Sequence, residues 1–379
     1  MSEFPTLQDI VWAAREMLPR PVWDFVTFGT ETETTLRRNR QSLDSLAFVP
    51  RVMRDVSDVD PSTEFLGMKL RIPVMLAPVG SIALLDPAGA VAAARTAQAF
   101  GILQIVSGFA APDYAVVARE CPGPLIYALH PRAEQPFLDD LVAGVVAAGY
   151  RAIAFVSEAA YYSRRERDLM SAVQTAAKRT RSYASYLAQQ RDELLQGKTP
   201  SKEGLLGTIN SWEMLERVKE RSKLPIILKG VMSAADARLA VQHGVDVIYV
   251  SNHGGRALDH GRGTAQVLAE IVAEVNGRAQ IIIDGGFVRG TDVLKAIALG
   301  AQAVCMGRMQ SWALAAGGMA GLMRMLEILE EEIIIAMGLL GVNRLSELTP
   351  DFVQKAEPVA APHPLSAFPV VMERIAAEK

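Results

Sequence analysis

The chain has 379 residues, half of them hydrophobic, and its 39 basic and 42 acidic side chains leave a formal net charge of −3. This length is ample for a buried core and fits either one large α/β barrel or two ordinary domains. The near-balance of charge excludes the strong positive field that gathers nucleic acid or an anionic membrane. We therefore expect small molecules as partners, and no nucleic acid.

The cysteines and the apolar stretches indicate the cellular compartment and whether the chain crosses a membrane. Cys121 and Cys305 are far apart and lack metal-ligand spacing, so we expect neither a disulfide framework nor a metal site, and a reducing cytosol suits them. The first residues lack the pattern of a secretory signal, and no window approaches ~20 uninterrupted apolar residues. We expect a soluble, unprocessed, cytoplasmic protein without a membrane span. The most apolar stretch, 333–342, predicts a buried helix and its end.

In chain order, residues 1–70 form an N-terminal extension, in which 7–18 predicts a helix and 31–40 is a charged stretch. Short apolar runs then recur, each ending in a small or polar residue and followed by a stretch with helical periodicity. There are eight runs: 73–80, 103–108, 125–130, 152–158, 225–230, 247–253, 280–286 and 303–308.

The runs lack period-2 alternation, which indicates strands that are covered on both faces. Eight consecutive βα units close most economically as a barrel, so we predict an α/β fold, a (β/α)8 TIM barrel, forming a single domain over 1–379. Stretches such as 234–243 and 291–299 predict helices that end near glycines. The charged segment 166–211, after the fourth strand, is longer than a minimal barrel needs and predicts a lid loop.

The active site of such a barrel lies where its strands end. The fifth strand ends in Lys229, the sixth is followed by His253, the seventh by Asp284 and two glycines, and the eighth by Gly307 and Arg308. Glycines after strands seven and eight let backbone N–H groups approach an anion, and arginines supply charge-assisted hydrogen bonds. These two strand ends therefore predict a phosphate site.

Two side chains at these ends suggest chemistry. His253, one of five histidines, stands at a strand end beside glycines and is a candidate base with a pKa near the working pH. Lys229 closes an otherwise apolar strand and is costly to bury alone. It predicts an anionic cofactor or substrate, or else an ion pair with a neighbouring carboxylate.

Three segments resemble the FMN-dependent α-hydroxy-acid oxidase and dehydrogenase family: 251–259 (SNHGGRALD), 284–293 (DGGFVRGTDV) and 307–308 (GR). The likeness extends over nearly the whole chain, from residue 18 to residue 352. The resemblance implies that FMN is the cofactor and that members assemble as homo-oligomers, usually homotetramers.

The resemblance also implies roles for individual residues. His253 would take a proton from the substrate while a hydride equivalent passes to flavin N5, and Lys229 would stand near flavin N1–C2=O. Arg256 would bind the substrate carboxylate, with Arg165 as a second cationic contact. The residues implied around the cofactor are Ala77, Pro78, Val79, Ser107, Ala128, Val156, Lys229, Ser251, Asp284, Gly285, Gly286, Arg289, Gly307 and Arg308.

Several substrate-side positions depart from the family. Phe25 replaces an active-site tyrosine, His130 replaces a second one, and Glu158 stands in place of the aspartate that pairs with the base. Losing one hydrogen bond to a charged group costs roughly 1.5–3 kcal/mol. We expect a more apolar pocket, lined by Phe25 and Phe109, in which His130 adds a titratable group or is simply a packed residue.

The flavin-side positions depart as well. Ala128 replaces a glutamine, Val156 replaces a threonine, and Val288 takes the position of one phosphate-side arginine, leaving Arg289 beside it. These changes remove polar contacts to the cofactor. They leave the strand-end residues Lys229, His253 and Arg308 in place.

The leading hypothesis is FMN-dependent oxidation of a 2-hydroxy acid, larger or more apolar than lactate, to the 2-oxo acid. The electron acceptor is left open among oxygen, a quinone and a protein. One alternative keeps the flavin but oxidises an amine or a modified peptide, or catalyses non-redox chemistry. A third is a non-catalytic barrel that has lost its cofactor.

Overall fold

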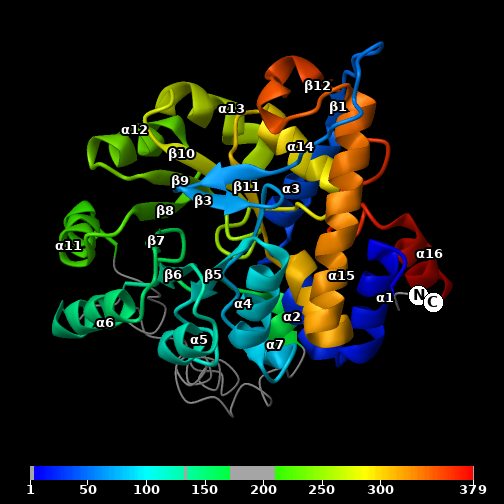
Figure 1. The fold of residues 1–379 in the computed structure, drawn as a ribbon. Helices are drawn as coiled ribbons and strands as arrows, with labels where there is room; N and C mark the ends of the chain where they lie inside the picture. The colour runs from blue at the N-terminus through cyan, green and yellow to red at the C-terminus, as the bar shows by residue number, and fades with distance from the viewer. Residues whose placement is uncertain (1–3, 132–134, 171–209, 379) are drawn as a thin grey trace.

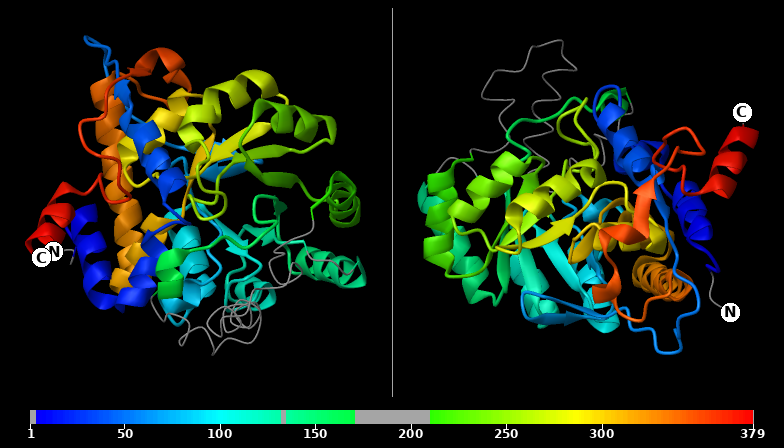
Figure 2. Two further views of the ribbon diagram at one scale, coloured as in Figure 1. Left: turned by 180° about the vertical axis from the view of Figure 1, so that it is seen from behind. Right: turned by 90° about the horizontal axis from the view of Figure 1, so that it is seen from above.

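The computed structural model describes residues 4–131, 135–170 and 210–378, and its centre is a closed barrel of eight parallel strands (Figures 1 and 2). Around the barrel the strand order is β10-β11-β4-β5-β6-β7-β8-β9. The strands are β4 (Val74–Leu76), β5 (Leu103–Ser107), β6 (Leu125–Leu129), β7 (Ala152–Val156), β8 (Ile226–Val231), β9 (Val247–Val250), β10 (Gln280–Ile283) and β11 (Ala303–Met306). Each falls within or against one of the eight predicted runs, so the TIM barrel is confirmed. β8 continues two residues past Lys229, where its register shifts at Gly230.

Both faces of the strands are buried, which explains their apolar sequences. Ile105 and Ile227 belong to the core inside the barrel, whereas their neighbours Val106 and Leu228 belong to the core between the strands and the outer helices. This alternation of direction is the normal consequence of strand geometry. The outer helices are α4 (Gly89–Phe100), α5 (Tyr114–Glu120), α6 (Gln135–Ala147), α11 (Trp212–Ser222), α12 (Ala234–Gln242), α13 (Thr264–Val275), α14 (Gly290–Ala298) and α15 (Arg308–Leu340).

The N-terminal extension is helical and ends in a hairpin. Thr6 caps α1 (Leu7–Met17) in a capping box with Asp9, which confirms the predicted first helix. Two further helices, α2 (Arg20–Thr27) and α3 (Thr34–Asp44), precede β1 (Leu46–Phe48), which pairs with β12 (Val353–Lys355). The hairpin of β2 (Thr63–Phe65) and β3 (Met68–Leu70) buries Phe65 and Leu70 in the core inside the barrel, so it closes the end opposite the predicted site.

The helix α15 is long and apolar enough to cross a membrane by length and composition, yet 61% of its most apolar window is buried. Non-helical backbone angles at Gly317 and Gly318 interrupt it. It packs against α1, α4 and α14 along one side of the barrel (Figure 1). It ends at Gly341 in the left-handed region, which confirms the predicted helix and its end. The stretch 333–342 is only partly buried, because Ile335 and Leu339 are exposed.

The predicted lid begins with α7 (Glu166–Met170), which contacts α2. Arg167 in this helix pairs with Glu33 at 2.6 Å, and its guanidinium lies 3.8 Å from the ring centroid of Phe28. The start of the segment is therefore fastened to the N-terminal extension. Residues 171–209 lie outside the described residues, so the lid remains a prediction.

At the C-terminus, α16 (Pro369–Ala377) lies beside α1, where Arg15 and Glu378 form an ion pair (Figure 1).

Candidate active site

One carboxylate joins two of the predicted site residues at the carboxyl ends of the strands. Glu158, just after β7, accepts hydrogen bonds through Oε1 from Lys229 Nζ on β8 and from His253 Nδ1, at 2.9 Å, after β9. The side chains of Lys229 and Glu158 are buried. Glu158 thus pairs with the candidate base. This is the role that the family resemblance implies for the aspartate that Glu158 replaces. The ion-pair alternative for Lys229 is also confirmed.

This contact fixes which nitrogen of His253 is available as a base. The neighbouring Lys229 ammonium favours the ionised carboxylate of Glu158, which can only accept hydrogen bonds. The Nδ1 of His253 must therefore carry the proton, and Nε2 is left with its lone pair.

The expectation of a pKa near the working pH is wrong for His253. Burial holds its pKa well below the usual 6.5, and the nearby cations Lys229, Arg165 and Arg256 lower it further. The imidazole is therefore neutral, and able to accept a proton, throughout the neutral pH range.

The loop that carries His253 requires its two glycines. His253 itself has a φ of 58°, and Gly254 and Gly255 follow in the same left-handed region. A Cβ on Gly254 would lie 2.8 Å from Arg308 Nη1, and one on Gly255 would lie 2.6 Å from the Leu36 backbone. The tight loop brings the base, Arg308 and the N-terminal extension together.

On the substrate side, the ring of Phe25 lies beside both predicted carboxylate-binding arginines. The guanidinium carbon of Arg256 is 4.7 Å from its ring centroid and that of Arg165 is 6.0 Å away. Arg256 also donates to the carbonyl oxygens of Phe25 and, at 3.1 Å, of Phe28. Arg165 donates to the Arg256 carbonyl oxygen at 3.3 Å. Phe25, Arg165 and Arg256 are therefore in contact with one another, and together they present an aromatic ring and two guanidinium groups.

A second aromatic contact lies at the neighbouring strand ends. The rings of Phe109, after β5, and His130, after β6, have centroids 4.1 Å apart at an interplanar angle of 40°. The Phe109 N–H donates to Ser107 Oγ at 3.2 Å. The two positions expected to change the pocket are thus in contact with each other.

Small apolar side chains line the ends of three strands near Lys229. Ala77 follows β4, and Ala128 and Val156 lie on β6 and β7; all are buried in the core inside the barrel. Pro78 and Val79 continue from Ala77 and are half-buried. Small side chains at strand ends leave room for a planar ring, and Ala128 and Val156 offer it no side-chain hydrogen bond.

Asp284 joins the ends of β9 and β10. Its carboxylate accepts hydrogen bonds from Ser251 Oγ at 2.7 Å and from the Tyr249 hydroxyl at 2.9 Å. The Tyr249 ring centroid also lies 5.4 Å from Lys229 Nζ. Tyr249 was not predicted as a site residue because it reads as part of an apolar strand. Its position two residues before Ser251, on the same side of β9, is the signal that could have identified it.

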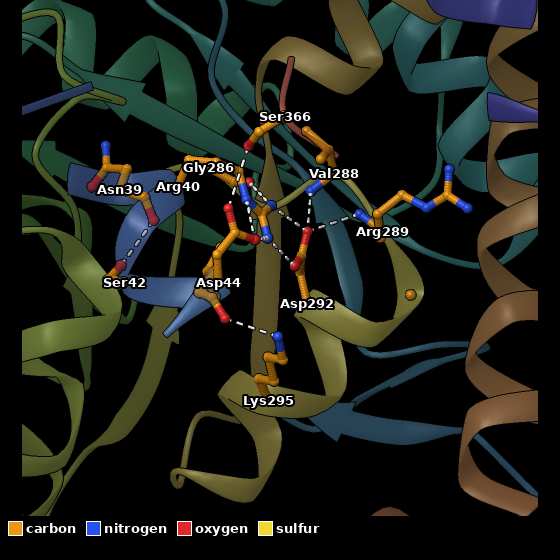
Figure 3. Close-up of polar contacts among 12 residues, drawn as sticks. Asn39, Arg40, Ser42, Asp44, Gly286, Val288, Arg289, Asp292, Lys295 and Ser366 are labelled. Carbon is orange, nitrogen blue, oxygen red and sulfur yellow. Dashed lines mark hydrogen bonds and ion pairs between the residues drawn. The ribbon is translucent and has the colours of Figure 1, made fainter. Parts of the chain in front are cut away.

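A buried ion pair holds the loop after β10, which contains Gly285 and Gly286 (Figure 3). Arg40 of α3 donates to the Gly286 carbonyl oxygen at 2.9 Å and pairs with Asp292 at 2.7 Å. Asp292 Oδ2 in turn accepts from the N–H groups of Val288 and Arg289, both at 3.1 Å. Burial raises the pKa of Asp292, but the charge and hydrogen bonds of Arg40 outweigh it and hold the pKa below its usual value.

The two predicted phosphate arginines have protein partners. Arg289 pairs with Glu332 of α15 at 2.6 Å, and Figure 3 shows its side chain extending away from Arg40. Arg308 donates to the carbonyl oxygens of Thr27, at 2.9 Å, and Phe28, at 3.3 Å. Burial lowers the pKa of Arg308 to about 10. Arg308 remains close to the base through Gly254, whereas the contact of Arg289 directs it toward α15.

The backbone at the start of α15 fits a phosphate group. Gly307 is the N-cap of this helix and provides no side-chain cap, so the first N–H groups are available to an anion. A Cβ on Gly307 would meet only the Ala77 Cβ, at 4.0 Å. The open space beside Gly307, the small strand ends and the buried Lys229 together fit FMN. The individual cofactor contacts stay predictions.

The chain is similar to known flavoenzymes over almost its full length. It is 34% identical to glycolate oxidase 1 of Oryza sativa subsp. indica over 382 residues, covering 96% of this chain and 100% of that enzyme. It is 37% identical to 4-hydroxymandelate oxidase of Amycolatopsis orientalis, covering 89% and 95%. A crystal structure of mandelate oxidase superposes with a TM-score of 0.82 at 33% identity, covering 94% of this chain and 100% of that one. Residues 14–355 match the model of the FMN-dependent dehydrogenases, and the chain therefore belongs to this family, with FMN as its cofactor.

Proposed function

We propose that the protein oxidises a 2-hydroxy acid, larger or more apolar than lactate, to the corresponding 2-oxo acid. The observation that carries this proposal is the contact between His253 and Glu158, because it leaves a neutral base nitrogen beside two guanidinium groups. A base next to a carboxylate-binding pair is what abstraction of a proton from a hydroxy acid requires.

In this reaction Arg256 and Arg165 bind the substrate carboxylate and orient the molecule against Phe25. His253 takes a proton from the substrate through Nε2, and Glu158 stabilises the imidazolium that forms. FMN, when bound, would supply the oxidant, accepting the second substrate hydrogen together with the two electrons as a hydride equivalent. Lys229 supplies positive charge at the strand ends, where negative charge develops on reduction.

The preference for a larger substrate rests on the aromatic residues. Phe25 presents a ring without the hydroxyl of the family's tyrosine, and the rings of Phe109 and His130, which are in contact, lie at the neighbouring strand ends. An aromatic substrate gains stacking with such rings, while a short aliphatic acid gains little. The relatives named 4-hydroxymandelate oxidase and mandelate oxidase support an arylglycolic acid as the substrate class.

We further propose oxygen as the electron acceptor, because several relatives are named as oxidases. A reducing compartment such as the cytosol suits the two free, buried cysteines. Homo-oligomers, expected from the resemblance, are tested by the mass of the purified protein in solution.

The experiment is an absorbance spectrum of the purified protein, followed by anaerobic titration with mandelate-like acids, aliphatic 2-hydroxy acids and 2-amino acids. Bleaching of the flavin by mandelate-like acids at lower concentrations than by lactate is expected. Bleaching by amino acids alone would replace the hydroxy acid with an amine substrate. Colourless protein that takes up no FMN, or product formed without consumption of an acceptor, would overturn the proposal.

A further inference from the structure

Glu158 serves two partners with a single oxygen. Both Lys229 Nζ and His253 Nδ1 donate to Oε1, whereas Oε2 is buried and has no hydrogen-bond partner within the described part of the chain. The Glu158 side chain is 8% exposed and that of Lys229 is 4% exposed. Solvent therefore screens this charge pair weakly.

The backbone of β8 makes room for a side chain of this length. Gly230 has a φ of 111°, and a Cβ there would lie 2.7 Å from Glu158 Oε2 and 2.8 Å from Glu158 Cβ. The register of β8 shifts at the same residue. An aspartate at position 158 is one methylene shorter, so it could not keep both contacts from the same backbone position.

We propose that Glu158 is a positioning residue that divides its negative charge between the base and Lys229, and so masks the lysine's positive charge from the flavin. The glutamate holds His253 in the tautomer that can act as a base. At the same time it weakens the stabilisation that Lys229 gives to negative charge at the strand ends. This inference rests on the flavin site and on the predicted place of Lys229 there, and not on the identity of the substrate.

Sulfite is a suitable probe because it needs no substrate. It adds as a nucleophile to N5 of an oxidised flavin, using its own electron pair, and leaves negative charge on the ring at N1–C2=O. An unmasked cation beside that position tightens sulfite binding. The measurement is the dissociation constant for sulfite, from the loss of flavin absorbance, with the FMN-loaded full-length protein.

In Glu158→Asp the shorter carboxylate keeps one partner at most, and Glu158→Gln removes the charge altogether. The sulfite dissociation constant is expected to fall by about tenfold in Glu158→Gln, because a charge pair that solvent screens weakly interacts strongly. In Glu158→Asp the sulfite dissociation constant should also fall, if the shorter carboxylate stays with His253 and leaves Lys229.

The matched control is Glu216→Gln, because Glu216 forms a similar pair with His243 at 2.7 Å but lies on the exposed surface. The control should leave sulfite binding unchanged.

A dissociation constant in Glu158→Gln within about twofold of the unmodified protein, or a weaker one, overturns the proposal. If sulfite binds to none of the proteins, the midpoint potential of the flavin is the second readout. A higher potential in Glu158→Gln supports masking, and an unchanged potential overturns it. Failure of every tested substrate to bleach the flavin would count only against the proposed function, since neither readout uses a substrate.

Discussion

The guanidinium of Arg256 lies over the ring of Phe25, with its Cζ 4.7 Å from the ring centroid, and donates to the carbonyl oxygen of the same residue. An arginine predicted to bind carboxylate is thereby anchored to α2 of the N-terminal extension. Because the ring carries no hydroxyl, Phe25 adds an apolar surface beside the two cations and no hydrogen-bond donor. The position of Phe25 therefore bears on which acids the enzyme prefers.

Replacing Phe25 by Tyr adds a hydroxyl beside the two guanidinium groups. A hydrogen bond that involves a charged group contributes about 1.5–3 kcal/mol, so kcat/KM for lactate is expected to rise about ten- to hundredfold. The gain for mandelate should be smaller, because in the proposed function its ring contributes packing that lactate lacks. Steady-state kinetics with both acids measure the change in preference.

The control for this substitution is Phe48→Tyr, since Phe48 lies on β1 with Lys295 Nζ 5.7 Å from its ring centroid, away from the strand ends. It makes the same chemical change beside a cation outside the site. An unaltered ratio of lactate to mandelate activity in Phe25→Tyr would show that Phe25 does not set the preference.

Removing the base should separate chemistry from cofactor binding. His253→Ala is expected to retain FMN, because the side chain contacts Glu158 and no predicted phosphate contact passes through it. Flavin reduction by substrate should slow by about 10²–10⁴-fold, the usual contribution of a general base. Stopped-flow absorbance under anaerobic conditions measures the rate, and reduction at an ordinary rate would refute the role of His253.

The strand ends could be predicted from the sequence because parallel strands place their carboxyl ends at one rim of a barrel. That rule alone brought Lys229, His253 and Asp284 together. Contacts between distant segments could not be predicted in the same way. Nothing in the local sequence pairs Arg40 with Asp292, or turns Arg289 toward Glu332, because these contacts arise only when α3 and α15 pack on the barrel. The pKa of His253 was misjudged for a related reason, since it depends on burial and on cations from several loops.

The pH dependence of flavin reduction should reflect that environment. Burial first, and then the charges of Lys229 and Arg165, hold the pKa of His253 well below 6.5. The neutral imidazole is the active form, so the reduction rate is expected to stay constant across neutral pH and to fall only as the pH drops through the lowered pKa. A rate that falls already between pH 7 and the ordinary value of 6.5 would contradict this environment. The measurement is the anaerobic reduction rate at saturating substrate over the acid range in which FMN stays bound.

The ion pair of Arg40 and Asp292 should support both stability and cofactor binding, because it holds the loop after β10 by its backbone. Removing one partner of a buried pair costs about 3–5 kcal/mol when the other charge is left uncompensated. Arg40 keeps a second ion pair, with Asp44 at 2.7 Å, so the lower end of this range is expected. Asp292→Ala is therefore expected to lower the free energy of unfolding by that amount and to weaken FMN binding. Urea unfolding measures the first quantity, and fluorescence titration of apoprotein with FMN measures the second.

An exposed ion pair on the same protein provides the comparison. Arg71, whose side chain is 53% exposed, pairs with Glu330 at 2.6 Å on the outer side of α15. Glu330→Gln should cost under about 1 kcal/mol, because water screens such pairs, and should leave FMN affinity unchanged. If Asp292→Ala destabilised the protein yet bound FMN as tightly as the unmodified chain, the pair would support the fold alone. The loop after β10 would then hold its shape through Asn39 and Thr264, which lie against Gly285 and Gly286.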